Sequence, residues 1–312
     1  MRVILFITLM LGALNTLSFA QDLKPTITMA VLGDSLSAAQ VSNSWLGIDL
    51  KENRASIIKY LRQSGKRNKN RDKSRVGRYL ENRELNWFDG QNIYSVSKQI
   101  TNAKNINIET LNQAISGDKS SDLLTQLSHL TEGSQEKWNK KLPDFIWILI
   151  GANDFCAEKL SASLPPYRLR KNIEKTIQKI DQLSPTTKVI LVALPKIDKL
   201  YNLSKDEIAF HSFTRDISCK QIREKANACQ TLTTELSLKD QAIRRILLNE
   251  YKYALNSLSL QFAGKVFTLN DLAEFDYTKS DLAVDCFHAN EKGQQRIADY
   301  LSDEFLDLIN IR

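Results

Sequence analysis

Short apolar runs alternate along this chain with longer segments whose apolar residues recur every three or four positions. The runs predict β-strands at Ile27–Leu32, Asn107–Leu111, Phe145–Ile150, Lys188–Leu194 and Lys265–Leu269. The longer segments predict helices at 91–103, 119–130, 167–183, 238–260 and 290–309. The third and fourth runs are almost wholly apolar, which is typical of central strands covered by helices on both faces. The alternation predicts a three-layer α/β/α sandwich around a five-stranded, mainly parallel sheet.

Glycine or polar residues follow three of the predicted strands. Ser35 comes after the first, Gly117 after the second and Asn153 after the third. Functional sites of open parallel sheets lie at the carboxyl ends of the strands. We therefore expect these three residues to share one edge of the sheet.

Ser35 is a candidate nucleophile within the sequence Gly33-Asp34-Ser35-Leu36. The apolar run before this tetrapeptide and the helix-compatible residues after it place the serine at a strand-to-helix turn. Such a turn exposes the hydroxyl, and the helix start offers unpaired N–H groups to a developing oxyanion. Gly-Asp-Ser is also ordinary turn chemistry, so the tetrapeptide alone does not decide the function.

His288 is the candidate general base among the three histidines. It ends the sequence Asp285-Cys286-Phe287-His288. A D-x-x-H turn lets the carboxylate accept the Nδ1 proton and leaves Nε2 free to take a serine proton. His129 and His211 have no comparable context, so we do not expect either in catalysis.

Gly117 and Asn153 are candidate hydrogen-bond donors for a tetrahedral intermediate. Gly117 ends the segment 112–117, where a backbone N–H can approach a substrate closely. Asn153 belongs to Gly151-Ala152-Asn153-Asp154 and offers a side-chain amide. Each has an ordinary explanation in turn geometry, but their order between the serine and the D-x-x-H turn favours a joint role.

These four blocks, in this order, resemble the GDSL or SGNH serine hydrolases. The resemblance spans residues 33–288 and implies an SGNH, flavodoxin-like fold without metal or cofactor. It also implies Ser35 as nucleophile and His288 as general base oriented by Asp285. The oxyanion donors would be the N–H groups of Ser35 and Gly117 and the amide of Asn153.

Three further segments resemble the phospholipase B-like branch of that family. They are Asn153-Asp154-Phe155-Cys156, the D-x-x-H block and 83–90. The expected activity is hydrolysis of a small-molecule or lipid ester, with a phospholipid or lysophospholipid as substrate. The alternatives are a carbohydrate O-acetylesterase and a non-catalytic binder of anionic surfaces.

The chain is expected to be one exported domain behind a signal peptide. Arg2, the apolar residues 3–14 and Ser18-Phe19-Ala20 match a secretory leader over residues 1–20. An uncleaved anchor is less favoured because polar residues interrupt the apolar segment. Residues 21–312 form the domain, with insertions at about 42–90 and 196–237, and the mature protein is periplasmic or secreted.

Positive charge is concentrated in the first insertion. The formal net charge is +7, and residues 51–78 hold eleven Lys or Arg residues against two acidic ones. One interpretation is peripheral contact with an anionic membrane surface. The other is a solvated insertion without a partner. No nucleic-acid recognition motif accompanies the segment, so we expect no nucleic-acid partner.

Four cysteines follow the leader: Cys156, Cys219, Cys229 and Cys286. An even number in an exported protein favours two disulfides, with three pairings open. Cys219 and Cys229 would close a small loop, which leaves Cys156 to pair with Cys286. A zinc site is the competing explanation, but these spacings match no common ligand pattern.

Overall fold

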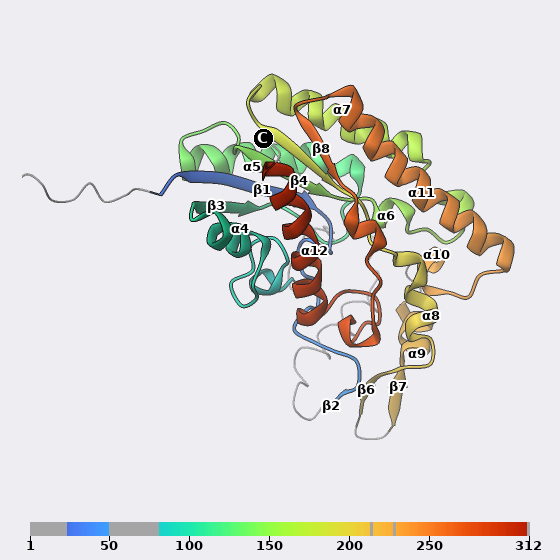
Figure 1. Ribbon diagram of the computed structural model, residues 1–312. Helices are drawn as coiled ribbons and strands as arrows, with labels where there is room; N and C mark the ends of the chain where they lie inside the picture. Colours follow the sequence, from blue (N-terminus) through green and yellow to red (C-terminus); the bar gives the residue numbers. More distant parts are fainter. Residues whose placement is uncertain (1–23, 50–80, 213–214, 227–228, 311–312) are drawn as a thin grey trace, which may run out of the picture.

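The computed structural model describes residues 24–49, 81–212, 215–226 and 229–310. Its central feature is a parallel sheet of five strands in the order β3-β1-β4-β5-β8 (Figure 1). The strands are β1 (Thr26–Gly33), β3 (Asn107–Asn112), β4 (Phe145–Leu149), β5 (Lys188–Val192) and β8 (Val266–Leu269). All five predicted strands are present, and the α/β fold class is confirmed. The predicted leader at 1–20 and the basic segment 51–78 lie outside the described residues.

The register of the sheet brings three strand ends to one edge. Gly33 of β1 pairs with Leu149 of β4, and Val31 pairs with Asn112 of β3. The segments that leave β1, β3 and β4 therefore start side by side. The inner residues of β1 are fully buried because helices cover both faces of the sheet.

Two layers of helices enclose the sheet (Figure 1). One layer consists of α4 (Val96–Lys104) and α12 (Glu291–Asn310), and the other of α5 (Leu123–Trp138), α7 (Pro166–Leu183) and α11 (Leu238–Gln261). All five predicted helices are present with shifted ends. The first, α4, begins at Val96 rather than at 91 because Ser95 has an extended backbone conformation. The second, α5, continues to Trp138, eight residues beyond the predicted end.

The last part of the first insertion belongs to the hydrophobic core. Trp87 and Phe88 are fully buried and pack against Trp147 of β4. Trp147 in turn contacts Phe305 of α12, with 4.8 Å between the ring centroids. Residues 81–90 are therefore fixed to the sheet.

A second, smaller sheet connects the two insertions, and no hydrophobic pattern predicted it. Its strands are β2 (Ile48–Asp49), β6 (Ile208–His211) and β7 (Asp216–Ser218), in the order β2-β6-β7. Strands of two to four residues are too short for an alternating pattern to stand out from loops. Figure 1 places this sheet at the end of the molecule away from α7.

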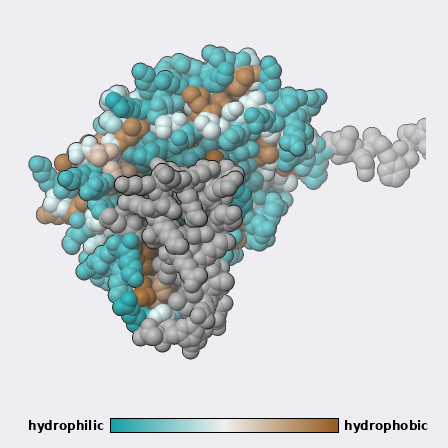
Figure 2. All heavy atoms as spheres, turned by 180° about the vertical axis from the view of Figure 1, so that it is seen from behind, coloured by the Kyte–Doolittle hydropathy of each residue, from teal (hydrophilic) through white to brown (hydrophobic). Residues whose placement is uncertain are grey.

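Short helices make up the rest of the helical structure in the described residues. They are α6 (Ala152–Phe155), α8 (Leu200–Ser204), α9 (Cys219–Ala226), α10 (Gln230–Thr233), η1 (Arg83–Leu85), η2 (Ser120–Asp122), η3 (Leu160–Ala162), η4 (Ile197–Lys199), η5 (Asp271–Glu274) and η6 (Lys279–Asp281). Among the described residues, no helix has the length and apolar character to cross a membrane. On the face shown in Figure 2, most of the described surface is hydrophilic and its hydrophobic patches are separate.

The cysteines form two disulfides, but the expected pairing is wrong. The bridges are Cys156–Cys229 and Cys219–Cys286. Cys219 begins the eight-residue helix α9. A helix of that length rises about 12 Å, whereas a disulfide joins Cα atoms within about 7 Å. The helix carries the chain away from Cys219 before it reaches Cys229, so the short spacing in sequence is not a short distance in space.

Candidate active site

Ser35 lies in the turn that follows β1, at the carboxyl edge of the sheet. The Ala38 N–H donates to the Asp34 carbonyl at 3.0 Å and closes this turn. A Cβ atom on Gly33 would lie 2.5 Å from the Leu149 carbonyl oxygen, so this position requires glycine. The missing side chain allows β1 and β4 to approach each other where the chain turns toward Ser35.

His288 and Asp285 form a hydrogen-bonded series with Ser35. His288 Nε2 lies 2.8 Å from Ser35 Oγ, and His288 Nδ1 lies 2.5 Å from Asp285 Oδ2. All three residues are at least nine-tenths buried. With the Nδ1 proton donated to the carboxylate, Nε2 can accept the serine proton. The structure thus brings together three residues that lie up to 253 positions apart in sequence.

The surroundings of Asp285 favour its ionised form. Burial alone would raise the pKa of Asp285, but the neighbouring His288 ring acts in the opposite direction. The N–H groups of His288 and Phe287 also donate to Oδ1, at 3.0 and 3.1 Å. Together these interactions hold the pKa of Asp285 below its ordinary value. An ionised carboxylate fixes the ring tautomer and stabilises an imidazolium.

Gly117 and Asn153 reach the same edge from β3 and β4. Gly117 has a φ of +90°, which favours glycine. No acceptor within the described residues pairs with the backbone N–H of Ser35 or of Gly117. The Asn153 side chain donates to the Asp118 carbonyl at 3.0 Å, and its amide carries a second hydrogen. The edge thus holds three N–H donors of the kind that stabilise an oxyanion.

Two buried side chains that sequence reasoning missed connect these loops. Gln126 of α5 accepts from the Gly33 N–H at 2.9 Å and donates to the Gly33 carbonyl and to Asp118 Oδ2, at 2.8 and 2.7 Å. Asp154 accepts from the Ser120 N–H and hydroxyl, at 2.8 and 2.7 Å. Burial raises the pKa of Asp154 in spite of these bonds. Asp154 stands inside the asparagine block, but no motif marks Gln126.

The remaining two histidines are exposed and are not hydrogen-bonded to Ser35, Asp285 or His288. His129 is exposed on α5. His211 is exposed on β6, with Nδ1 2.7 Å from Asp216 Oδ1. Within the part of the chain that is described, no group of three His, Cys, Asp or Glu side chains could hold a metal ion. The cysteines that a zinc site would have used are all in disulfides.

Both disulfides attach the second insertion to the loops of this site. Cys156, which follows α6, is joined to Cys229 at the start of α10. Cys286, in the turn that ends at the site histidine, is joined to the first residue of α9. Arg223 of the same helix is buried and donates to the Cys286 carbonyl at 3.0 Å. Residues 196–237 therefore help to hold the carboxyl edge of the sheet.

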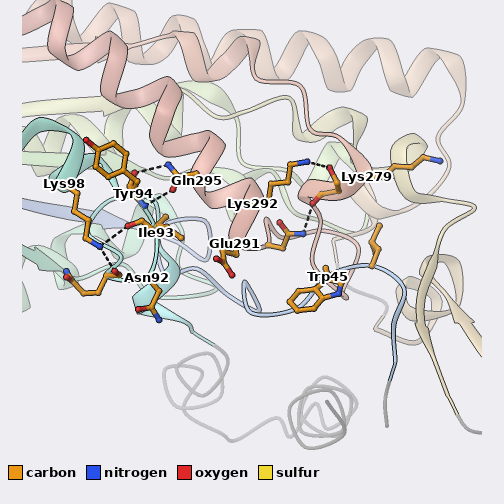
Figure 3. Close-up of a pocket in the computed structure, with 13 residues that line it drawn as sticks. Trp45, Asn92, Ile93, Tyr94, Lys98, Lys279, Glu291, Lys292 and Gln295 are labelled. Carbon is orange, nitrogen blue, oxygen red and sulfur yellow. Dashed lines mark hydrogen bonds between the residues drawn. The ribbon is translucent and has the colours of Figure 1, made fainter. Parts of the chain in front are cut away.

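A groove of about 920 Å³ lies at the start of α12, and none of the candidate catalytic residues lines it (Figure 3). Asn290, two residues after His288, contributes to its wall. The remaining wall comes from residues 45–46 before β2, from the chain before and at the start of α4, from η6 and from the start of α12. Its aromatic and charged residues are Trp45, Tyr94, Lys98, Lys279, Glu291 and Lys292. The Lys279 ammonium pairs with Glu207, which leaves Lys98 and Lys292 against the Glu291 carboxylate.

Asp34, next to the candidate nucleophile, is fully buried. Its Oδ1 accepts from the Leu36 N–H at 3.0 Å, whereas Oδ2 has no partner among the described residues. Burial raises the pKa of Asp34 to about 7, against the opposing effects of the Leu36 N–H and of His288. This carboxyl therefore titrates near neutral pH.

Asp34→Asn is expected to weaken the dependence of stability on pH. Because the pKa of Asp34 is raised, its contribution to stability is fully present below pH 3.8, the ordinary pKa. This contribution is lost as the pH rises through about 7. Asparagine keeps an acceptor for Leu36 and does not ionise. Thermal unfolding between pH 5 and 9 should show that the free energy of unfolding falls less in the variant. The difference should reach up to a few kcal/mol at high pH. Parallel curves for the two proteins would contradict this assignment.

Comparison with known families agrees with the four sequence blocks. Residues 29–301 match the family described as GDSL-like Lipase/Acylhydrolase. The chain belongs to this family. The predicted resemblance is thereby confirmed, and this GDSL hydrolase is a carboxylic ester hydrolase. No curated protein matches the sequence.

Solved structures with a similar fold include both lipases and carbohydrate esterases. A family two carbohydrate esterase from Clostridium thermocellum has a TM-score of 0.50 and 11% identity, covering 92% of this GDSL hydrolase and 66% of that chain. The extracellular lipase of Streptomyces rimosus has a TM-score of 0.46 and 15% identity, covering 89% and 99%. An acetylxylan esterase from Geobacillus stearothermophilus has a TM-score of 0.47 and 12% identity, covering 90% and 95%. At 11% identity, the likeness to the carbohydrate esterase concerns the fold alone.

Proposed function

We propose that the protein is an exported serine esterase that releases acyl groups through a covalent acyl-enzyme. The hydrogen-bonded series from Ser35 Oγ through His288 to Asp285 carries this proposal. A serine hydroxyl 2.8 Å from an imidazole that is fixed by a buried carboxylate is an activated nucleophile. Export is supported by the two disulfides, which persist in oxidising compartments.

The reaction would proceed in two halves. Ser35 Oγ attacks the ester carbonyl carbon while His288 Nε2 takes the hydroxyl proton. The N–H groups of Ser35 and Gly117 and the amide of Asn153 would stabilise the oxyanion. The bond to the alcohol oxygen then breaks, and His288 returns the proton to that oxygen. Water repeats the sequence on the acyl-serine and releases the acid.

A phospholipid or lysophospholipid is the proposed substrate. Lys98 and Lys292, against Glu291, give the groove that Asn290 lines a small excess of positive charge, which suits a phosphodiester. The basic segment 51–78 adds positive charge of the same sign in the sequence, outside the described residues. The likeness of the blocks at Cys156 and Cys286 to the phospholipase B-like branch supports the same substrate class.

An acetylated carbohydrate is the second candidate substrate. Trp45 and Tyr94, in the same groove, are 50% and 47% exposed. Exposed aromatic faces can pack against the apolar faces of sugar rings. The same catalytic residues would serve an acetyl ester, because only the groups that bind the acyl chain and the alcohol would differ.

A panel of substrates distinguishes the two candidates. We expect faster fatty-acid release from phosphatidylcholine and its lyso form than acetate release from acetylated xylooligosaccharides. Lys292→Gln should raise KM for lysophosphatidylcholine and leave KM for p-nitrophenyl acetate unchanged. Lys140→Gln is the matched control, because Lys140 is exposed before β4, at the opposite end of the strands. Cleavage of acetylated sugars without phospholipid hydrolysis would reject the lipid substrate.

A further inference from the structure

The residues before η1 hold the turn that contains Ser35. Glu81 forms an antiparallel bridge with Gln40. The Gln40 N–H in turn donates to the Ser35 carbonyl at 3.1 Å. The backbone at Glu81 is therefore two hydrogen-bonded steps from the candidate nucleophile.

The Arg83 side chain reaches the loop that follows β3. Its Nη1 donates to the Asn112 carbonyl at 2.6 Å, and its Nη2 donates to the Ala114 carbonyl at 2.8 Å. The planar guanidinium thus binds two carbonyls of one loop, which a lysine ammonium cannot do with the same geometry. The two carbonyls lie five and three residues before Gly117.

The Glu81 carboxylate holds the same loop closer to Gly117. Glu81 Oε1 accepts from the Ser116 N–H at 3.1 Å, and Oε2 pairs with Arg83 Nη2 at 2.9 Å. The Glu81 side chain is only 3% exposed, so water does not freely replace its bond from Ser116, whereas the Arg83 side chain is 41% exposed. A single ion pair therefore connects three successive points of the loop.

Gly117 is exposed at the surface of the described residues. A Cβ atom built on Gly117 meets nothing within 4 Å, and the residue adopts a positive φ. Its location must come from the hydrogen bonds of neighbouring residues. The bonds made by Glu81 and Arg83 are directly on its amino-terminal side.

We propose that Glu81 and Arg83 are positioning residues that set the separation between the N–H groups of Ser35 and Gly117. This inference rests on the proposed function, in which both groups bind the oxyanion. The segment contacts the serine turn through its backbone and the glycine loop through its side chains. A shift of about 1 Å in one donor would weaken binding of the transition state far more than binding of the substrate.

Three variants test the proposal by steady-state hydrolysis of a p-nitrophenyl ester. Arg83→Lys and Glu81→Ala should lower kcat about 10- to 100-fold, with KM within about twofold of wild type. Glu81→Gln keeps an oxygen acceptor for the Ser116 N–H and should retain most of kcat. The Ki of a trifluoromethyl ketone, whose adduct carries the oxyanion, should rise by the factor by which kcat/KM falls.

Arg170→Lys is the matched control. Arg170 also pairs with a carboxylate, that of Glu174 at 3.0 Å, but it lies on α7 and donates to α11. This variant should change the melting temperature and leave kcat unchanged. If Glu81→Ala does not fold, Arg83→Lys and Glu81→Gln still give the comparison.

Two results would overturn the positioning role. One is a folded Arg83→Lys protein with wild-type kcat, and the other is a loss of kcat that only follows the unfolded fraction. Failure of the proposed function is distinct, because wild-type enzyme would then hydrolyse no ester through Ser35.

Discussion

Ser35→Ala is expected to lower kcat for any ester substrate at least about 10⁴-fold. The variant removes the attacking oxygen, and no neighbouring group can replace it in the acyl-enzyme. A fluorophosphonate probe should label wild-type protein on Ser35 and leave the variant unlabelled. The fold should persist, because within the described part of the chain the lost hydroxyl makes one hydrogen bond, to His288, worth about 1 kcal/mol.

Ser37→Ala is the matched control for this experiment. Ser37 lies in the same turn and is fully buried, and its hydroxyl has no partner among the described residues. Labelling and kcat should both survive in this variant. Labelling of Ser35→Ala would mean that another residue is the nucleophile. Wild-type protein that neither labels nor hydrolyses esters would favour the non-catalytic binder.

The sequence predicts the main sheet well because strands that are buried on both faces are apolar at nearly every position. Residues 145–149 are apolar at every position, and nearly all are buried in β4. The helix ends are less predictable. Gln91 and Tyr94 fit the helical spacing of α4, yet they form a turn before it. The Tyr94 N–H donates to Gln295 of α12, a contact that local periodicity does not contain.

The candidate site was predictable because Ser35, Gly117 and Asn153 follow strands, and Asp285 and His288 form one short motif. A parallel sheet places such ends together whatever the distance in sequence, as it does for Ser35 and Asn153. The supporting residues depend instead on how the insertions fold back. Gln126 and Arg223 contact backbone groups far away in sequence. Since the backbone groups are the same for almost every residue type, no sequence motif indicates these partners.

The disulfide pairing also depends on how the second insertion folds. Four cysteines allow three pairings, and the choice depends on where α9 and α10 lie. Cys229 meets Cys156 because the Thr231 N–H donates to the Ala157 carbonyl at 3.1 Å, which sets the two segments side by side. That pairing could not be read from spacing, since it follows from the path of the second insertion.

Asp285→Asn should lower kcat about 10⁴-fold while leaving the fold of the turn in place. Asparagine Oδ1 can still accept from the N–H groups of Phe287 and His288, which hold the turn. Its amide nitrogen, however, would face His288 Nδ1 and donate to it. The ring proton would then lie on Nε2, which could no longer accept the proton of Ser35.

Orientation of the His288 ring and stability of the loop can be measured separately. Asp281→Asn is the control, because Asp281 is a fully buried carboxylate paired with Arg296 in the adjoining segment and does not contact His288. Asp281→Asn should lower the melting temperature and leave kcat unchanged. Asp285→Asn should lower kcat and leave the melting temperature nearly unchanged. Ring nitrogen-15 shifts of His288 should report the Nδ1-H tautomer in wild-type protein and the Nε2-H tautomer in Asp285→Asn. A kcat of Asp285→Asn within about tenfold of wild type would be far from the roughly 10⁴-fold loss that the wrong tautomer causes. It would mean that the carboxylate does not orient the base.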